Sequence, residues 1–189
     1  MEFERTGIDG LILVKPRAIG DERGFFMESF RQDKLQAELD KVGLSVNFVQ
    51  DNQARSAKAG VLRGLHFQTP PHAQAKYLGV SSGAVFDVAV DLRRASPTFG
   101  KWRSFILSAD NRHRLFIPAG FAHGYLTLEP DTEVIYKVDD YYAADCDSGI
   151  AWDDPQLAVN WPIHEFGGAP VLSEKDRVLP KLADFKSPF

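Results

Sequence analysis

The clearest alternation of hydrophobic and polar positions lies in the middle of the chain, at residues 85–92. Apolar side chains occupy every second position there: Phe86, Val88, Val90 and Leu92. Asp87 and Asp91 fall on the opposite face. A period of two is that of a β-strand, because successive side chains of a strand point to opposite faces. This segment is therefore predicted to be a strand.

Shorter runs of the same kind follow at residues 102–107, 114–117, 124–128 and 133–138. Turn residues such as Asp110-Asn111 and Pro130-Asp131 separate them. Many short strands with regular turns are typical of a sandwich or barrel. We therefore expect a mainly β fold, with an antiparallel jelly-roll barrel as the architecture and residues 1–189 as one domain.

Helical spacing appears near the N-terminus, at residues 33–42. Leu35, Leu39 and Val42 share one helical face, and Gly43 is suited to end the helix. From about residue 143 the pattern becomes irregular, so we expect short helices and loops that fold back on the barrel.

Composition limits the class of protein. With 44% hydrophobic and 25% charged residues, the 189-residue chain has the balance of a soluble globular protein. A net charge of -4 argues against a nucleic-acid-binding protein. No apolar run approaches the ~18 residues of a membrane span, and the N-terminus lacks an apolar signal core. Cys146 is the single cysteine, which excludes an intrachain disulfide and fits a cytoplasmic protein.

Candidate chemistry is concentrated in the segment Gly60-Val61-Leu62-Arg63-Gly64-Leu65-His66-Phe67-Gln68, which Lys76 follows. A histidine can exchange a proton near neutral pH, and a nearby lysine can hold the negative charge that remains. A lone histidine in a strand is more often a hydrogen-bonded core residue. The neighbouring Arg63, Lys76 and glycines favour a functional site, since a glycine in a strand can mark close approach of a ligand or backbone.

A second histidine, His123, ends a Pro-x-Gly-x-x-His pattern that begins at Pro118, as in the second motif of cupins. A metal-binding cupin also needs an earlier His-x-His pair, but the chain has His66-Phe67-Gln68 instead. Metal sites of this kind need three converging ligands, so the count disfavours a metal. His123 is either a turn residue or part of a site, and His72, His113 and His164 are expected at the surface.

Two further residues are ambiguous from sequence alone. Tyr136 shares a strand face with Val134 and Val138, predicted to be the inner one, where it is either a core aromatic or an acid that points into a cavity. Asp176 could orient a histidine, as the carboxylate of a catalytic triad does, although a solvated surface charge is the ordinary role.

Arg63 poses a geometric question. It lies three residues before His66, so in a regular strand the two side chains point to opposite faces. Either Gly64 breaks the alternation, or Arg63 serves a different site, such as one across a dimer interface.

Taken together, these motifs resemble those of the dTDP-4-dehydrorhamnose 3,5-epimerases, a family of cupin-fold isomerases that act on nucleotide sugars. The resemblance runs from about residue 8 to residue 181. It is carried by the segments 21–28, 50–52, 60–68, 74–76, 87–93, 118–124, 152–155 and 172–176.

The resemblance implies a homodimeric, metal-free and cofactor-free enzyme. It would invert C3 and C5 of dTDP-4-dehydro-6-deoxy-D-glucose to give dTDP-4-dehydro-L-rhamnose. His66 matches the family's base, Asp176 its partner, Tyr136 the opposing acid and Lys76 the group that stabilises the enolate. The matches to substrate contacts are Arg23, Glu28, Gln50, Asn52, Arg63, His123, Asp147 and Lys175. Asp147 stands where the family usually has Glu.

Other functions remain open at this point. A single-carbon epimerase or a 3,4-ketoisomerase of another deoxysugar pathway would keep His66 and Tyr136 and hold the sugar differently. A module that binds a nucleotide sugar without turnover would not need both residues. A metal-dependent cupin oxygenase is disfavoured by the ligand count.

Overall fold

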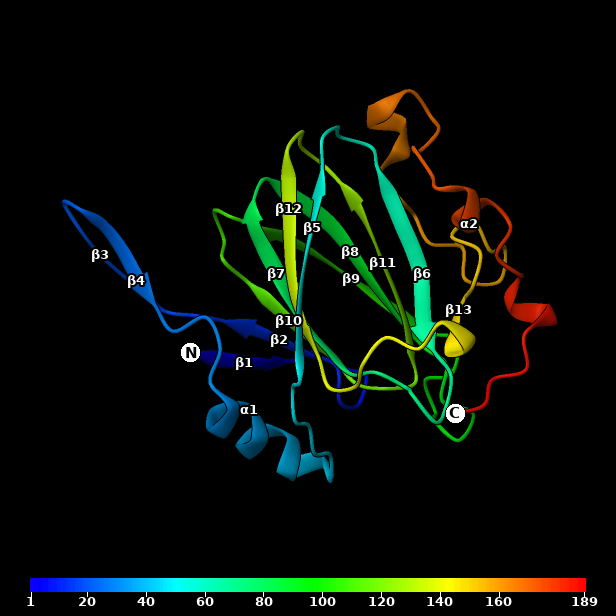
Figure 1. Cartoon of the computed structure of the whole chain (residues 1–189), viewed down its shortest axis with the longest axis horizontal. Helices are drawn as coiled ribbons and strands as arrows, with labels where there is room; N and C mark the ends of the chain where they lie inside the picture. Colours follow the sequence, from blue (N-terminus) through cyan, green and yellow to red (C-terminus); the bar gives the residue numbers. More distant parts are fainter.

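The computed structural model describes residues 1–189, and antiparallel β-structure dominates it (Figure 1). One sheet has six strands in the order β1 (Glu2–Arg5), β2 (Ile12–Lys15), β10 (Arg114–Ile117), β7 (Lys76–Ser82), β12 (Thr132–Val138), β5 (Gln50–Ser56). The other has five, in the order β13 (Asp147–Gly149), β6 (Leu62–Gln68), β11 (Phe121–Thr127), β8 (Ala84–Asp91), β9 (Trp102–Ser108). The predicted jelly roll is confirmed.

The two sheets face each other and bury an apolar core between them. This core takes Leu13, Leu78 and Val134 from the six-stranded sheet, and Ala89 and Tyr125 from the five-stranded one. The barrel is not closed by hydrogen bonds all the way round, because β5 is an edge strand that pairs only with β12. β5 contributes Ala54 to the wall of a cavity.

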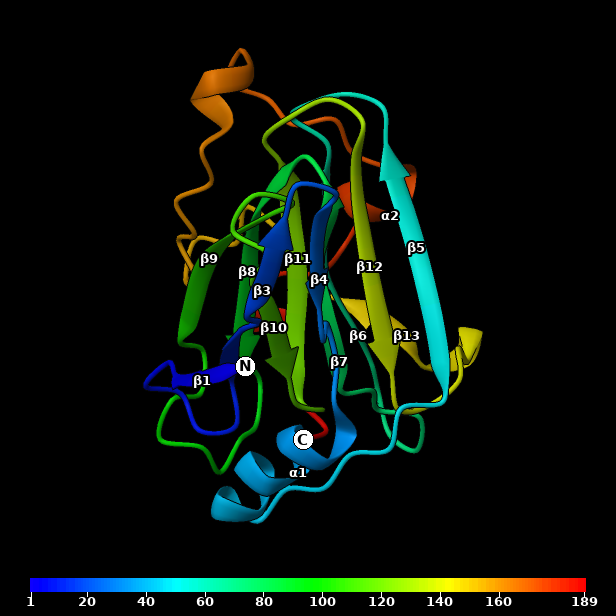
Figure 2. The ribbon, with the colours of Figure 1, turned by 90° about the vertical axis from the view of Figure 1, so that its left-hand side faces the viewer.

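The helices cover the outer faces of the sheets. Helix α1 (Gln32–Leu39) and the 3-10 turn η1 (Asp40–Val42) occupy the predicted helical segment, and Gly43 ends it with a left-handed backbone at φ 70°. Leu35 and Leu39 are fully buried against residues of β2, β7 and β10. Figure 2 shows α1 at one end of the sheets.

The C-terminal third folds back as predicted, and covers the outer face of the five-stranded sheet. Its elements are η2 (Ala144–Cys146), β13, η3 (Ile163–Phe166), α2 (Glu174–Arg177) and η4 (Leu182–Asp184). Strand β8 is consequently buried on both faces. The predicted alternation of β8 is correct, and its Asp87 face points to the interior, where Asp87 is fully buried beside Tyr125 of β11.

A hairpin of β3 (Ala18–Asp21) and β4 (Gly24–Met27) pairs with neither sheet and projects from the body (Figure 1). It carries three exposed apolar side chains: Ile19, Phe25 and Phe26. None of the helices has both the length and the apolar character needed to cross a membrane.

Candidate active site

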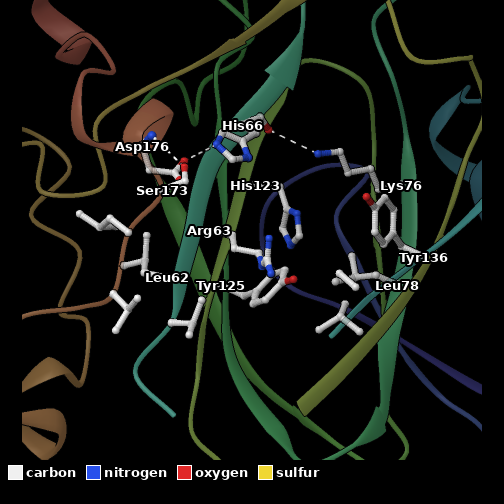
Figure 3. Close-up of a pocket in the computed structure, with 15 residues that line it drawn as sticks. Leu62, Arg63, His66, Lys76, Leu78, His123, Tyr125, Tyr136, Ser173 and Asp176 are labelled. Atoms are coloured by element: carbon white, nitrogen blue, oxygen red, sulfur yellow. Dashed lines mark hydrogen bonds and ion pairs between the residues drawn. The ribbon is translucent and has the colours of Figure 1, made fainter. Parts of the chain in front are cut away.

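A cavity of about 400 Å³ lies between the two sheets (Figure 3). It is lined by residues of five strands, β5, β6, β7, β11 and β12, and by the segment 171–176. His66, Lys76, Tyr136, Asp176, Arg63 and His123 all contribute to its wall. The structure therefore brings six of the twelve predicted site residues together at one cavity.

His66, on β6, is held by a buried carboxylate. Its Nε2 lies 2.5 Å from Oδ1 of Asp176, which is 3% exposed. Ser173, the N-cap of α2, donates from its hydroxyl to Oδ2 of Asp176 at 2.6 Å. Burial alone would raise the pKa of Asp176, but the hydrogen bonds from His66 and Ser173 outweigh burial and hold that pKa below its usual value. An ionised carboxylate only accepts hydrogen bonds, so it fixes the proton of His66 on Nε2 and leaves Nδ1 free.

Gly64 decides the question posed by Arg63. Its φ of +124° suits glycine, and a Cβ there would meet the Cα of Gly124 at 2.5 Å. The register between β6 and β11 shifts at this point, where Tyr125 pairs with Arg63 and His123 pairs with His66. Alternation is broken, and Arg63 and His66 line the same cavity of one chain. The guanidinium of Arg63 also donates to the Arg55 carbonyl of β5 at 3.4 Å.

Lys76 and Tyr136 come from the opposite sheet. Figure 3 shows Tyr136, on β12, across the cavity from His66, and Lys76, on β7, directed at the backbone of His66. The ammonium of Lys76 donates to the His66 carbonyl at 3.4 Å. Burial lowers the pKa of Lys76 to about 8, while nearby Asp87 opposes the shift. Burial raises the pKa of Tyr136, so its hydroxyl keeps its proton at neutral pH.

His123 also has a carboxylate partner, in the strand next to its own. Its Nε2 lies 2.9 Å from Oδ2 of Asp87, and both residues are buried. Beside them, burial raises the pKa of Tyr125 to about 12. Across the whole chain, no group of three or more His, Cys, Asp or Glu side chains is arranged to hold a metal ion.

A polar hollow adjoins the cavity. Gln50, Asn52, Asp147 and Lys175 line it together with Lys76, His66 and Tyr136. Asp147 forms an ion pair with Lys175 and also accepts a hydrogen bond at 3.2 Å from the hydroxyl of Tyr142. Four more of the predicted substrate contacts thus lie next to the cavity, including Asp147 at the position where the resembled family has Glu.

Arg23 and Glu28 are not brought to this site within the chain. Arg23 sits at the tip of the projecting hairpin, with 84% of its side chain exposed and Asp21 as its ion-pair partner. Glu28 pairs with Arg31 and Lys34 near the start of α1. Of the remaining histidines, His72 and His164 are exposed, as expected, whereas His113 is half-buried.

Two cavity residues, Tyr125 and Ser173, were not singled out from sequence, and neither was Asp87, which contacts the cavity residue His123. Tyr125 follows His123 by two residues, so the period of a strand was the available signal for its inward direction. Ser173 precedes Asp176 by three residues, the spacing of a helix N-cap. No sequence signal identified Asp87 as the partner of His123, because their pairing depends on strand register.

Comparison with known proteins identifies the family to which this chain is related. The family model for dTDP-4-dehydrorhamnose 3,5-epimerase matches residues 5–184. The chain belongs to the dTDP-4-dehydrorhamnose 3,5-epimerase family. The enzyme of that name from Pseudomonas aeruginosa is 48% identical over 184 residues, which cover 97% of each chain.

Solved structures of the family have a similar fold. A dTDP-4-dehydrorhamnose 3,5-epimerase from Bacillus anthracis, with TDP and pyrophosphate bound, is 51% identical and superposes with a TM-score of 0.87 over 96% of this chain and 99% of its own. A 3'-monoepimerase from Streptomyces bikiniensis in complex with dTDP-quinovose is 33% identical, with a TM-score of 0.84 over 94% of this chain and 86% of its own. The cupin-type jelly roll of this family thus occurs in enzymes that differ in the number of carbons they invert.

Proposed function

We propose that the protein is an epimerase that inverts C3 and C5 of dTDP-4-dehydro-6-deoxy-D-glucose and forms dTDP-4-dehydro-L-rhamnose. The observation that carries the proposal is the placement of His66, with its buried Asp176 partner, across one cavity from Tyr136 (Figure 3). Family membership over residues 5–184 supports the same reaction.

To invert a carbon beside a ketone, the enzyme must remove a proton from one face of the sugar and return a proton to the opposite face. C3 and C5 both flank the C4 carbonyl, so loss of a proton from either gives an enolate. His66 takes the proton on one side through its free Nδ1, and Asp176 stabilises the imidazolium that forms. Tyr136 returns a proton from the other side. A positioned acid or base of this kind contributes ~10²–10⁴-fold.

The enolate oxygen needs a positive partner, and Lys76 supplies it. Removal of one preorganised donor from such a site costs about 2.7–4 kcal/mol, which is as large as the contribution of the base. Lys76 fits this role because it lines the same polar hollow as His66 and Tyr136, and its ammonium is partly buried beside the His66 carbonyl.

The diphosphate and nucleoside require a separate set of contacts. Arg63 is suited to phosphate oxygens because its planar fork binds them bidentately. We assign the outer contacts to Gln50, Asn52, His123, Asp147 and Lys175, which lie on the cavity wall or in the adjoining hollow.

Arg23 and Glu28 require a second copy of the chain, so we also propose a homodimer. The hairpin that holds Arg23 carries exposed Ile19, Phe25 and Phe26, a combination that a solitary chain would leave in water. Exposed apolar clusters of this kind mark interaction surfaces. In this dimer the hairpin of one subunit delivers Arg23 and Glu28 to the cavity of the other.

Hydrogen exchange in D₂O tests the reaction. The 4-keto sugar nucleotide is incubated with the enzyme and examined by NMR for deuterium at C3 and C5. Label at both carbons together with the L-rhamno product supports the proposal. Label at one carbon indicates the alternative that the 3'-monoepimerase similarity favours, and no label leaves a binding module. Migration of the keto group from C4 to C3 would indicate a 3,4-ketoisomerase.

A further inference from the structure

Tyr125 lines the active-site cavity, and the proposed reaction gives it no role. It lies on β11, two residues after His123, and is 6% exposed. Figure 3 shows its phenol oxygen directed into the cavity, without a hydrogen bond to any residue drawn. The oxygen is also accessible, because the fully buried side-chain atoms without a partner are Oδ1 of Asp87 and Nε of Arg112. The hydroxyl of Tyr125 is therefore available to a bound molecule.

The ring and the hydroxyl of Tyr125 meet different surroundings. The ring packs into the apolar core between the sheets, in the same cluster as Val85, Leu115 and Val134. A phenylalanine would fill the same space in this core. A hydroxyl in an apolar setting costs free energy unless it finds a hydrogen-bond partner. Core packing thus accounts for the ring, whereas the oxygen requires a polar partner in the cavity.

Tyr125 is not placed to act as a second acid. Its strand pairs with β6, so Tyr125 and His66 project from the same sheet, whereas Tyr136 projects from the opposite one. Inversion needs an acid that faces the base. In the ladder of β6 and β11, His123 lies opposite His66. Tyr125 lies opposite Arg63, about 7 Å further along the strand at the usual rise per residue.

A neutral phenol at this place suits a hydroxyl group of the sugar. Burial raises the pKa of Tyr125 to about 12, so the phenol keeps its proton at neutral pH and can both donate and accept. The diphosphate of the substrate needs positive charge, the C4 oxygen is assigned to Lys76, and the C6 methyl group forms no hydrogen bonds. The groups that remain are the two free hydroxyls of the sugar ring, on C2 and C3.

We propose that Tyr125 is a specificity-determining residue, whose phenol hydroxyl forms a hydrogen bond with a free ring hydroxyl of the sugar, on C2 or C3. The proposal rests on the proposed function for the identity of the sugar, but the contact is one of binding and involves no proton transfer. A site that presents a buried polar group to a substrate hydroxyl discriminates against an analogue without that hydroxyl, because the protein group is left unpaired.

Binding measures this contact without turnover. The ligand is dTDP-6-deoxy-D-glucose, which has no ketone and does not react, and its 2-deoxy and 3-deoxy analogues are titrated beside it by calorimetry. For one of the two analogues, the ratio of its Kd to that of the parent ligand should be about fivefold to tenfold smaller in Tyr125→Phe than in the parent protein. The variant has no oxygen that the analogue could leave unpaired, and the analogue affected identifies the hydroxyl.

Tyr77→Phe is the matched control. Tyr77 is as buried as Tyr125, but its hydroxyl donates to the carbonyl of Ser29 at 2.8 Å and its side chain does not line this cavity. Both Kd ratios should stay at parental values in Tyr77→Phe, while its urea midpoint falls because a hydrogen bond within the protein is lost. The urea midpoint of Tyr125→Phe should not fall. A fall as large as that of Tyr77→Phe would mean that the Tyr125 hydroxyl is bonded within the fold, against the proposal.

The Kd ratios decide between a sugar contact and a structural role. Parental ratios for both analogues in Tyr125→Phe, or an equal loss of affinity for all three ligands, would overturn the proposal. Hydrogen exchange in D₂O is measured separately on the 4-keto sugar nucleotide. Absence of exchange together with a changed ratio would remove the epimerase reaction and leave the contact standing, whereas exchange at both carbons with unchanged ratios would remove the contact alone.

Discussion

At the scale of single residues, Lys76 is a group that the fold tolerates at a cost. Burial lowers its pKa to about 8, against ~10.4 for a free lysine. Between these two values the unfolded chain holds more protons than the folded one, so the stability of the protein rises with pH across that interval. Below pH 8 the folded state carries the full penalty of a buried ammonium.

Replacement of Lys76 by methionine should therefore stabilise the protein and inactivate it. We expect Lys76→Met to raise the free energy of unfolding at neutral pH by about 1–3 kcal/mol, with the gain declining above pH 8. Urea denaturation near neutral pH and near pH 10 measures the difference. Lys58→Met, at an exposed lysine, serves as the control. A loss of stability in Lys76→Met would mean that the ammonium is well solvated.

Asp176 should matter for rate far more than for folding. Asp176→Asn removes the charge that stabilises protonated His66, so exchange at C3 and C5 is expected to fall by about 10²–10⁴-fold. Glu174→Gln changes an exposed carboxylate in the same short helix and should have no effect. Full exchange in Asp176→Asn, measured by NMR in D₂O, would show that the Asp176 carboxylate does not contribute to proton abstraction.

Tyr136 is expected to act after the first proton is removed. Tyr136→Phe lacks the hydroxyl that returns a proton on the face opposite His66. Some exchange should survive, because His66 can return a proton to the face from which it took one, while the yield of inverted product falls by about 10²-fold or more. NMR of the same reaction reads both quantities. If both stay at parental levels, another group is the acid.

At the scale of elements, the path of β6 depends on Gly64. A side chain at this position meets the backbone of Gly124 at 2.5 Å, and the φ of +124° is unfavourable for any other residue. Gly64→Ala should cost about 3 kcal/mol or more and misplace Arg63 relative to His66.

Gly43→Ala gives the comparison for Gly64. Gly43 also has a left-handed backbone, at φ +70°, but its Cβ would lie in open space. Its cost should be limited to about 1 kcal/mol. Chemical denaturation of both variants gives the two losses of stability, and their difference measures the cost of the close contact with Gly124 beyond that of the backbone conformation. Equal losses would show that the contact with Gly124 carries no energy.

The elements also explain how far the sequence alone could lead. Alternation located β8, β9, β10, β11 and β12, because each presents an apolar face to a core. It missed β5, whose sequence is Gln-Asp-Asn-Gln-Ala-Arg-Ser: Gln50 and Asn52 line the polar hollow beside the cavity, and the alternate side chains are exposed. A strand that serves a polar site lacks the apolar signal of a core strand.

The candidate site, too, could be predicted from the sequence only in part. His66, Lys76 and Tyr136 were suggested by residue type and strand position, and the family resemblance then implied their roles. Their meeting with Asp176, about 110 residues beyond His66, depends on the C-terminal third folding over β6. The contact between Asp87 and His123 depends on the register of β8 and β11. Such long-range pairings are set by tertiary packing, which no local pattern contains.

At the scale of the whole molecule, the proposed dimer implies that each active site contains residues of both subunits. If Arg23 serves the cavity of the other subunit, two inactive variants can complement each other in a mixed dimer. Arg23→Ala lacks the donated contact, and His66→Ala lacks the base, but a mixed dimer combines one subunit of each. One of its two cavities then has His66 from its own chain and Arg23 from the partner, and the other cavity carries both defects.

Mixing the two variants after unfolding and refolding should therefore restore activity from a pair of nearly inactive proteins. Random pairing makes about half of the dimers mixed and leaves about a quarter of all cavities intact, so about a quarter of parental kcat is expected. Phe25→Ser with Phe26→Ser in both chains should abolish the recovery, because it weakens the apolar hairpin contact. Arg23 acting within its own chain would leave every mixed cavity with one defect, and mixing would then restore nothing.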